Sequence, residues 1–361
     1  MKYVEEYRQK ELVLGLADEI AAKLDRPVTL MEVCGTHTMA IHRHGMLDVL
    51  PRQLKLLSGP GCPVCVTPTS FIDAAIDLSR GGDVTIATFG DLVRVPGSAS
   101  SLERRKAEGA DVVTVYSPLD ALSLAQQHPY RQTVFLGIGF ETTAPTIAVS
   151  VREASKRAVR NFSVLAGNKL VPPALRALLQ SKDVKIDGFI CPGHVSTIIG
   201  ARVYEPVVTE FSVPCVVAGF EPADILAAVL MLVEMVVSGK PQVRNAYPRA
   251  VTRDGNRAAL ACMNEVFRIE DSSWRGLGTI PSSGLGLAHA YREFDARERF
   301  GLVMRDKHDT SGCRCGDVLR GAIEPGKCPL FAEQCTPEHP VGPCMVSSEG
   351  TCAAHYKYKR R

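Results

Sequence analysis

The pair Cys62-Pro63-Val64-Cys65 is the most specific chemical signal of the sequence. Two thiols at this spacing can form a disulfide with a small ring, and a helix N-terminus close by would stabilise the thiolate form. A C-x-x-C pair is also half of a structural zinc site. The proline between the two cysteines is more typical of redox motifs, so we favour a redox pair over a zinc half-site.

Cys34 and His37 lie in the segment CGTHTMAIHRHG (34–45), directly after an apolar run. A thiolate three residues from an imidazole can bind a soft or borderline metal, and Cys34 can equally be a nucleophile paired with His37. A lone cysteine is usually a small buried hydrophobe, and His42 and His44 fit solvated helix positions equally well. We therefore predict Cys34 and His37 as site residues and leave His42 and His44 open.

Glu141 and His194 occupy equivalent places in two other segments, GFETTAP (139–145) and CPGHVS (191–196). A carboxylate and an imidazole after a strand can transfer a proton or orient a ligand. Each also has a structural explanation, because Glu141 can interact with the N-terminus of a helix that starts at Thr143, and backbone groups can satisfy His194. We predict both as site residues that assist the chemistry.

The last 49 residues hold six of the twelve cysteines. These six are Cys313, Cys315, Cys328, Cys335, Cys344 and Cys352. Thiols are kept reduced in the cytoplasm, where such a density indicates metal, cluster or redox chemistry. Zinc ribbons normally use two short C-x-x-C knuckles, which the tail lacks, whereas four well-separated thiolates can enclose a [4Fe–4S] cluster. Composition alone leaves open which four of the six would bind.

Short apolar runs, each followed by a loop rich in Gly, Pro, Thr, His or Cys, recur along the chain and position these residues. The runs cover residues 29–34, 54–58, 84–90, 133–140, 162–167, 186–190 and 214–220. Strands that alternate with helices predict βαβ units and parallel sheets, so the fold class is α/β. In such sheets ligands bind at the carboxyl ends of the strands, where the candidate residues lie.

The pattern divides the chain into four stretches. We expect an N-terminal helix and strand with the CGTH motif in 1–50, a first α/β domain with the C-x-x-C pair in 51–130, a second in 131–240, and a C-terminal domain in 241–361. The segment His128-Pro129-Tyr130 separates the two rounds of strands, giving one sheet before about residue 130 and one after it. Weak periodicity and the cysteines mark the last stretch.

Charge and hydropathy exclude several classes of partner. The 42 basic and 39 acidic residues give a net charge of +3, which is too balanced for a protein that binds nucleic acid mainly through its phosphates. The N-terminus lacks the pattern of a signal peptide, and the longest apolar run, Ile225 to Val237, is broken by Glu234 and too short to span a bilayer. We expect a cytoplasmic protein that binds neither nucleic acid nor membrane.

Several long motifs in fixed order resemble the HypD family of hydrogenase maturation factors over essentially the whole chain. They are CGTHTMAIHRHG, GPGCPVCVTP, GFETTAPT, GNKLVPPA, CPGHVS and the tail from CRCGDVLRG to GTCAAHYKY. The resemblance implies two Rossmann-like α/β/α domains and a third, mostly α domain with a [4Fe–4S] cluster. It also implies that Cys313, Cys328, Cys335 and Cys352, spaced C-x14-C-x6-C-x16-C, hold that cluster.

The resemblance further implies a function. Members of the family form, with the small chaperone HypC, a scaffold that serves the hydrogenase large-subunit precursor through HypC. The transient Fe(CN)2CO unit of [NiFe]-hydrogenase is assembled on it, with cyanide from HypE after HypF has made the carbamoyl precursor. Cys34 would hold the iron, Cys62 and Cys65 would be redox-active, and Thr36, His37, Thr142 and His194 would offer hydrogen bonds to cyanide.

Two other functions use part of the same residues. A stand-alone [4Fe–4S]-dependent disulfide reductase would use the cluster and the C-x-x-C pair but would leave the CGTH segment without a role. A zinc-stabilised interaction protein would use only the thiols and would be colourless.

Overall fold

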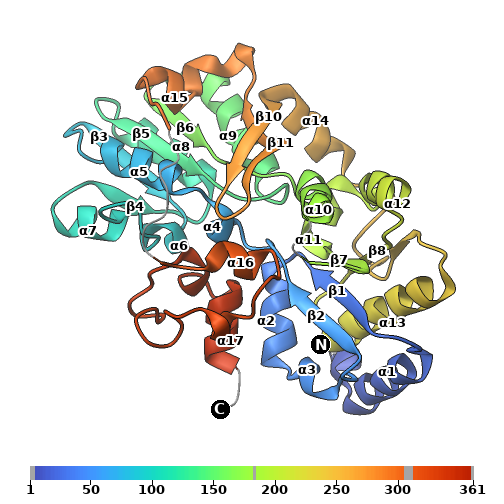
Figure 1. Cartoon of the computed structure of the whole chain (residues 1–361). Coiled ribbons are helices and arrows are strands. Elements are labelled where there is room, and N and C mark those ends of the chain that lie inside the picture. The colour runs from blue at the N-terminus through green and yellow to red at the C-terminus, as the bar shows by residue number, and fades with distance from the viewer. Residues whose placement is uncertain (1–4, 182–183, 305–311, 359–361) are drawn as a thin grey trace.

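The structure is a computed structural model, and it describes residues 5–181, 184–304 and 312–358. Two parallel sheets form its two lobes (Figure 1). Sheet A has the strand order β2-β1-β7-β8-β9, and its strands are β1 (Val28–Glu32), β2 (Leu54–Ser58), β7 (Gly188–Pro192), β8 (Cys215–Ala218) and β9 (Val243–Asn245). Sheet B has the order β4-β3-β5-β6, and its strands are β3 (Val84–Thr88), β4 (Val112–Thr114), β5 (Gln132–Gly137) and β6 (Phe162–Ala166). The predicted α/β class with two parallel sheets is confirmed.

The strands divide between the sheets differently from the expected split near residue 130. The chain begins in sheet A, crosses to sheet B after β2, and returns to sheet A at β7. β1 therefore pairs with β7, so that Leu30 faces Gly188. The segments that connect the lobes therefore include the one with Cys62 and Cys65 after β2, the one that follows β6, and the one between β9 and α14.

Helices surround both sheets. The helices that precede β6, the last strand of sheet B, are η1 (Glu5–Arg8), α1 (Lys10–Lys23), α2 (Gly35–Arg43), α3 (Met46–Val49), α4 (Pro63–Val66), α5 (Thr69–Leu78), α6 (Gly90–Val93), α7 (Leu102–Ala107), α8 (Pro118–Gln127) and α9 (Ala144–Lys156). Those after it are α10 (Val171–Gln180), α11 (Gly193–Ile199), η2 (Arg202–Tyr204), α12 (Glu205–Phe211), α13 (Pro222–Ser238), α14 (Arg257–Val266), η3 (His289–Phe294) and α15 (Ala296–Arg299).

Both faces of each sheet are buried, as continuous apolar runs require. In sheet A, Ile190 and Val216 pack in a core with α1 and α13, while Phe189 and Val217 face a second core. This second core also holds one face of sheet B and residues of the C-terminal tail, so it joins the two lobes. A third core packs α8, α9 and α14 on the other face of sheet B.

The stretch 241–361 is not one mostly helical unit. β9 completes sheet A, and β10 (Phe267–Trp274) and β11 (Gly278–Leu287) form an antiparallel hairpin that packs with α14 on the sheet B lobe. Only the described tail is a small region of short helices, namely α16 (Cys315–Leu319), η4 (Pro325–Lys327), η5 (Pro343–Met345) and α17 (Thr351–Tyr358). α17 lies beside α2 (Figure 1). Within the described ranges, no helix has the length and apolar character needed to cross a bilayer.

Candidate functional site

Cys34 caps the N-terminus of α2, directly after β1. Its backbone N–H donates to Oε2 of Glu32 at 2.9 Å, and the nearby backbone N–H groups of His37 and Thr36 lower the pKa of its thiol. Burial raises the pKa of the thiol to about 12, because the two N–H donors offset only part of the cost of a buried thiolate. Cys34 is therefore a protonated thiol that must lose its proton to bind a metal.

Two buried or partly buried carboxylates lie next to this thiol, and sequence reasoning missed both. Glu32, the last residue of β1, also accepts the hydroxyl of Thr38, and burial raises its pKa to about 7. Glu349 of the tail accepts the hydroxyl of Thr36 at 2.7 Å. Both carboxylates also raise the pKa of Cys34 by their charge. A thiol between two acids is a favourable place for a cation.

His37 is a neutral imidazole. Burial is the main cause that lowers its pKa to about 4. Its Nε2 lies 2.8 Å from the carbonyl oxygen of Gly219, which can only accept, so Nε2 carries the proton. Nδ1 is then the unprotonated nitrogen, and it is buried with no hydrogen-bond partner in the described part of the chain. The ring N–H of His37, which was expected to offer a hydrogen bond to cyanide, thus already donates to Gly219, and the other ring nitrogen is an acceptor.

His194 reaches the same region through Phe220. The rings of His194 and Phe220 stack with their centroids 3.9 Å apart, and the centroid of the His37 ring lies 5.1 Å from that of Phe220. His194 is exposed, unlike His37, and partial burial lowers its pKa. His42 and His44, which the sequence left open, lie at the opposite end of α2, where the ring of His42 meets that of His355.

Cys62 and Cys65 lie at α4, where the chain leaves sheet A for sheet B, and both thiols are buried. The preceding residue, Gly61, contacts the Cys34 loop so closely that a Cβ would overlap the backbone of Cys34. The Gly61 carbonyl also accepts the N–H of Gly35 at 2.9 Å. The thiol pair and Cys34 therefore belong to one packed unit, as the positions of their strands predicted.

All six tail cysteines line a single small cavity, whose other walls are mainly apolar. Neighbouring thiols change the pKa values of Cys313, Cys315, Cys344 and Cys65, through the pairs Cys313–Cys315, Cys315–Cys344, Cys344–Cys352 and Cys344–Cys65. A continuous series of thiols thus runs from the tail to Cys65. Sequence reasoning left Cys315 and Cys344 without a role, and this contact gives Cys344 a central place.

The donor set of this cavity fits an iron–sulfur cluster. In the described ranges, no group of three or more His, Cys, Asp or Glu side chains is arranged to hold a metal ion, so the fit depends on the residue types that line the cavity. A cluster needs one thiolate for each of four irons, in apolar surroundings and with N–H groups near the sulfurs. The N–H of Val341 donates to the sulfur of Cys335 at 3.4 Å, and Leu330 and Phe331 line the cavity.

Glu141 is not part of the Cys34 cluster of contacts. Its Oε1 accepts the N–H of Val171 at 3.0 Å, so it stabilises the N-terminus of α10, not of the helix from Thr143. Its Oε2 is buried with no hydrogen-bond partner among the described residues, and burial raises the pKa of the carboxyl to about 7. The side chain predicted to transfer a proton is therefore a nearly isolated internal acid.

Replacing Glu141 with glutamine should stabilise the protein at pH 8 and have little effect at pH 4. A carboxyl with a pKa of about 7 in the fold and 4.5 as its ordinary value stabilises the fold fully below pH 4.5 and loses this contribution as pH rises through 7. Glutamine stays neutral, so its advantage should reach about 3 kcal/mol at pH 8. Urea unfolding of both proteins at the two pH values measures this. A constant difference between them would contradict it.

Comparison with known proteins places this arrangement in a family. A family model described as "HypD: Hydrogenase formation hypA family" matches residues 11–359. Hydrogenase maturation factor HypD of Cupriavidus necator is 50% identical over 371 residues, covering 100% of this chain and 98% of the relative. HypD2 of Bradyrhizobium diazoefficiens is 49% identical (100% and 97% covered), and HypD of Escherichia coli K12 is 44% identical (100% and 99% covered). The chain therefore belongs to the HypD family of hydrogenase maturation factors.

Proposed function

We propose that this chain is a scaffold for the Fe(CN)2CO unit of [NiFe]-hydrogenase, which it carries together with HypC in the cytoplasm. The observation that supports this most directly is that three groups of residues meet: Cys34 with its two acids, the segment of Cys62 and Cys65, and the thiols of the tail. Cys34 with its two acids meets the segment of Cys62 and Cys65, and Cys65 meets the tail thiols through Cys344. A metal-binding thiol and a redox pair would thus act in one place.

Cys34 is the group that would hold the iron. Iron that carries cyanide and carbon monoxide is soft, and a thiolate suits it. The negative charges of Glu32 and Glu349 favour a cation at this place. One of the two carboxylates would also accept the proton that the Cys34 thiol gives up when the metal binds. The free Nδ1 of His37 is a second acceptor for this proton. HypC would supply the remaining protein ligand and later carry the unit to the large-subunit precursor.

Cys62 and Cys65 would supply electrons for the delivery of cyanide. HypF would make the carbamoyl precursor, and the thiocarboxamide that results on HypE would leave a sulfur-bound cyano group once it has lost water. Its release as a thiol and hydrogen cyanide needs two electrons and two protons. This equals what the dithiol form of Cys62 and Cys65 gives up on forming a disulfide. His194 would assist by proton transfer or orientation.

Cys313, Cys328, Cys335 and Cys352 would hold a [4Fe–4S] cluster in the tail cavity. When bound, such a cluster supplies one-electron redox chemistry. Cys315 and Cys344 would then remain as thiols between this cavity and Cys65.

Anaerobic copurification with HypC tests the proposal. We expect infrared bands of cyanide and carbon monoxide on iron, roughly four sulfides per chain, and at least one iron beyond those of the cluster. A disulfide reductase would instead carry no cyanide-bearing iron and would reduce a foreign disulfide as the isolated chain. A colourless sample without sulfide would favour the zinc-stabilised alternative. Either result would overturn the scaffold.

A further inference from the structure

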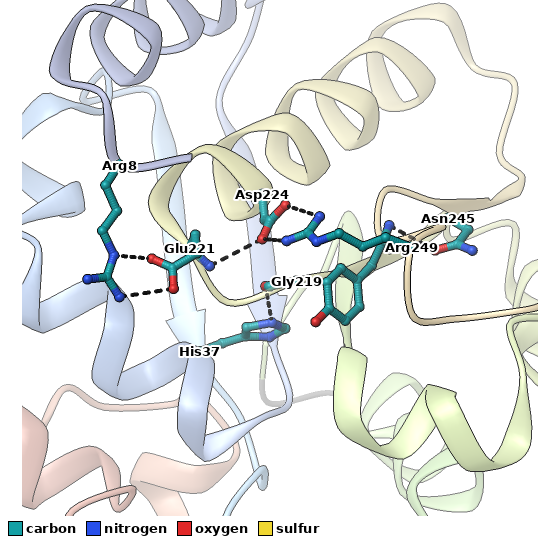
Figure 2. A network of polar contacts seen from close by, with 8 residues as sticks. Arg8, His37, Gly219, Glu221, Asp224, Asn245 and Arg249 are labelled. Carbon is teal, nitrogen blue, oxygen red and sulfur yellow. Dashed lines mark hydrogen bonds and ion pairs between the residues drawn. The ribbon is translucent and has the colours of Figure 1, made fainter. Parts of the chain in front are cut away.

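The turn of residues 219–224, between β8 and α13, contacts both histidines of the site. We propose that Asp224, locked by Arg249, is a positioning residue that holds the Gly219 carbonyl against Nε2 of His37, so that Nδ1 stays the unprotonated nitrogen. This inference rests on the proposed function, because it concerns the acceptor beside Cys34. The residues involved are drawn in Figure 2.

Asp224 supports the Gly219 peptide directly. A Cβ on Gly219 would overlap Oδ2 of Asp224 and would lie 2.7 Å from Cδ2 of Tyr247, so these two side chains fill the space directly beside the Gly219 Cα. The same carboxylate accepts the N–H of Glu221 at 3.3 Å, which closes the turn at the start of α13. The direction of the Gly219 carbonyl therefore depends on where the Asp224 carboxylate lies.

Arg249 fixes the Asp224 carboxylate. Its two terminal nitrogens bind the two carboxylate oxygens at 2.8 and 2.5 Å (Figure 2), and Asp224 is almost completely buried. The guanidinium lies between two aromatic rings, 4.3 Å from the centroid of Tyr7 and 4.4 Å from that of Tyr247. A bidentate pair with the cation stacked on both sides has a single geometry, which lysine cannot reproduce.

The turn positions the rings as well as the proton. Phe220 stacks on His194 and lies tilted against His37, so a shift of its backbone would move both imidazoles. A hydrogen bond to the second ring nitrogen sets the tautomer and the orientation of a functional histidine, and loss of such a partner typically costs about 10-fold to 100-fold in metal affinity. Asp224 and Arg249 would keep the Gly219 carbonyl in place as the hydrogen-bond partner of His37.

The exposed ion pair on the same turn offers a matched control. Arg8 binds the carboxylate of Glu221 with two nitrogens (Figure 2), and half of the Arg8 side chain is exposed. Arg8→Gln therefore removes an ion pair from the turn while leaving in place the Arg249–Asp224 pair and the hydrogen bond from the Glu221 N–H to Asp224.

The test uses nitrogen-15-labelled histidine in the full chain without iron or HypC. In the wild type we expect an unprotonated Nδ1 signal for His37 and an Nε2–H proton that exchanges slowly with water. Asp224→Asn and Arg249→Lys should make this proton exchange at least tenfold faster, whereas Arg8→Gln should leave it unchanged. Signals of the other histidines verify the fold in each variant. Slow exchange that persists in both variants would overturn the inference.

A second measurement tests whether the positioning of His37 by Asp224 affects how much iron the complex with HypC holds. In the complex with HypC, Asp224→Asn should lower the amount of cyanide-bearing iron about tenfold, and Arg8→Gln should not. An unchanged amount in Asp224→Asn would overturn the functional part of the inference. If the wild type itself carries no such iron, the proposed function fails, while the exchange measurement still decides whether Asp224 positions His37.

Discussion

Replacing Cys34 with alanine should abolish the cyanide and carbon monoxide infrared bands of the complex with HypC, while the fold and the brown colour of the tail cluster remain. The bonds that shape the Cys34 loop come from the backbone: the Cys34 N–H to Glu32, and the Gly35 N–H to Gly61. Alanine keeps all of them, because it removes only the sulfur. The iron loses its thiolate, and the nearby carboxylates are hard ligands that do not suit low-spin iron.

Cys262→Ala is the matched control for this experiment. Cys262 is also a buried thiol, but it lies on α14 against the outer face of sheet B, in a core without Cys34. It should keep the bands and the iron content of the wild type. Circular dichroism and the sulfide assay verify that both variants fold and hold the cluster. Bands of wild-type strength in Cys34→Ala would show that Cys34 is not the anchor of the iron.

The strands could be predicted from the sequence because most of them are buried on both faces. All seven predicted runs coincide with strands of the two parallel sheets, and LKLLS (54–58) matches β2 residue for residue. β4 has only three residues, and β10 and β11 are rich in Ser and Gly and contain an irregularity between Glu270 and Ser272, so none of the three gives a clear apolar run.

The assignment of strands to sheets could not be read from the same signal. Apolar periodicity says that a segment is a strand, but it does not say which strand lies beside it. The pairing of β1 with β7 joins segments more than 150 residues apart, and it follows from how helices and loops pack. The expected boundary near residue 130 assumed that strands close in sequence share a sheet, which is the common arrangement but not the one here.

Site residues that directly follow a strand could be predicted from the sequence. Site residues that lie within a strand or come from the tail could not. Cys34, Cys62 and His194 come at the carboxyl ends of parallel strands, and the structure brings them together. Glu32 was taken as part of a strand, although an acid at the end of a buried run was a usable signal. Glu349 comes from the tail, and no local pattern indicates that it reaches α2.

Cys344 should prove necessary for electron flow to Cys62 and Cys65, although it should not be a cluster ligand. It is the thiol that touches Cys65 on one side and Cys315 and Cys352 on the other. Alanine at this position opens a gap in the series of thiols. We expect Cys344→Ala to keep its iron and sulfide. When a one-electron donor that reduces free disulfides only slowly is added, the Cys62–Cys65 disulfide of this variant should no longer be reduced rapidly.

The measurement follows alkylation of Cys62 and Cys65 by mass spectrometry after the donor is added anaerobically. In the wild type both thiols should appear rapidly, and in Cys344→Ala only at the rate set by the donor alone. Cys215→Ala serves as the control, because Cys215 is equally buried but lies in β8, where its thiol partner is Cys191. Reduction at the wild-type rate in Cys344→Ala would exclude Cys344 from the route. Loss of iron and sulfide would instead make Cys344 a ligand and would show that the spacing C-x14-C-x6-C-x16-C does not describe the cluster.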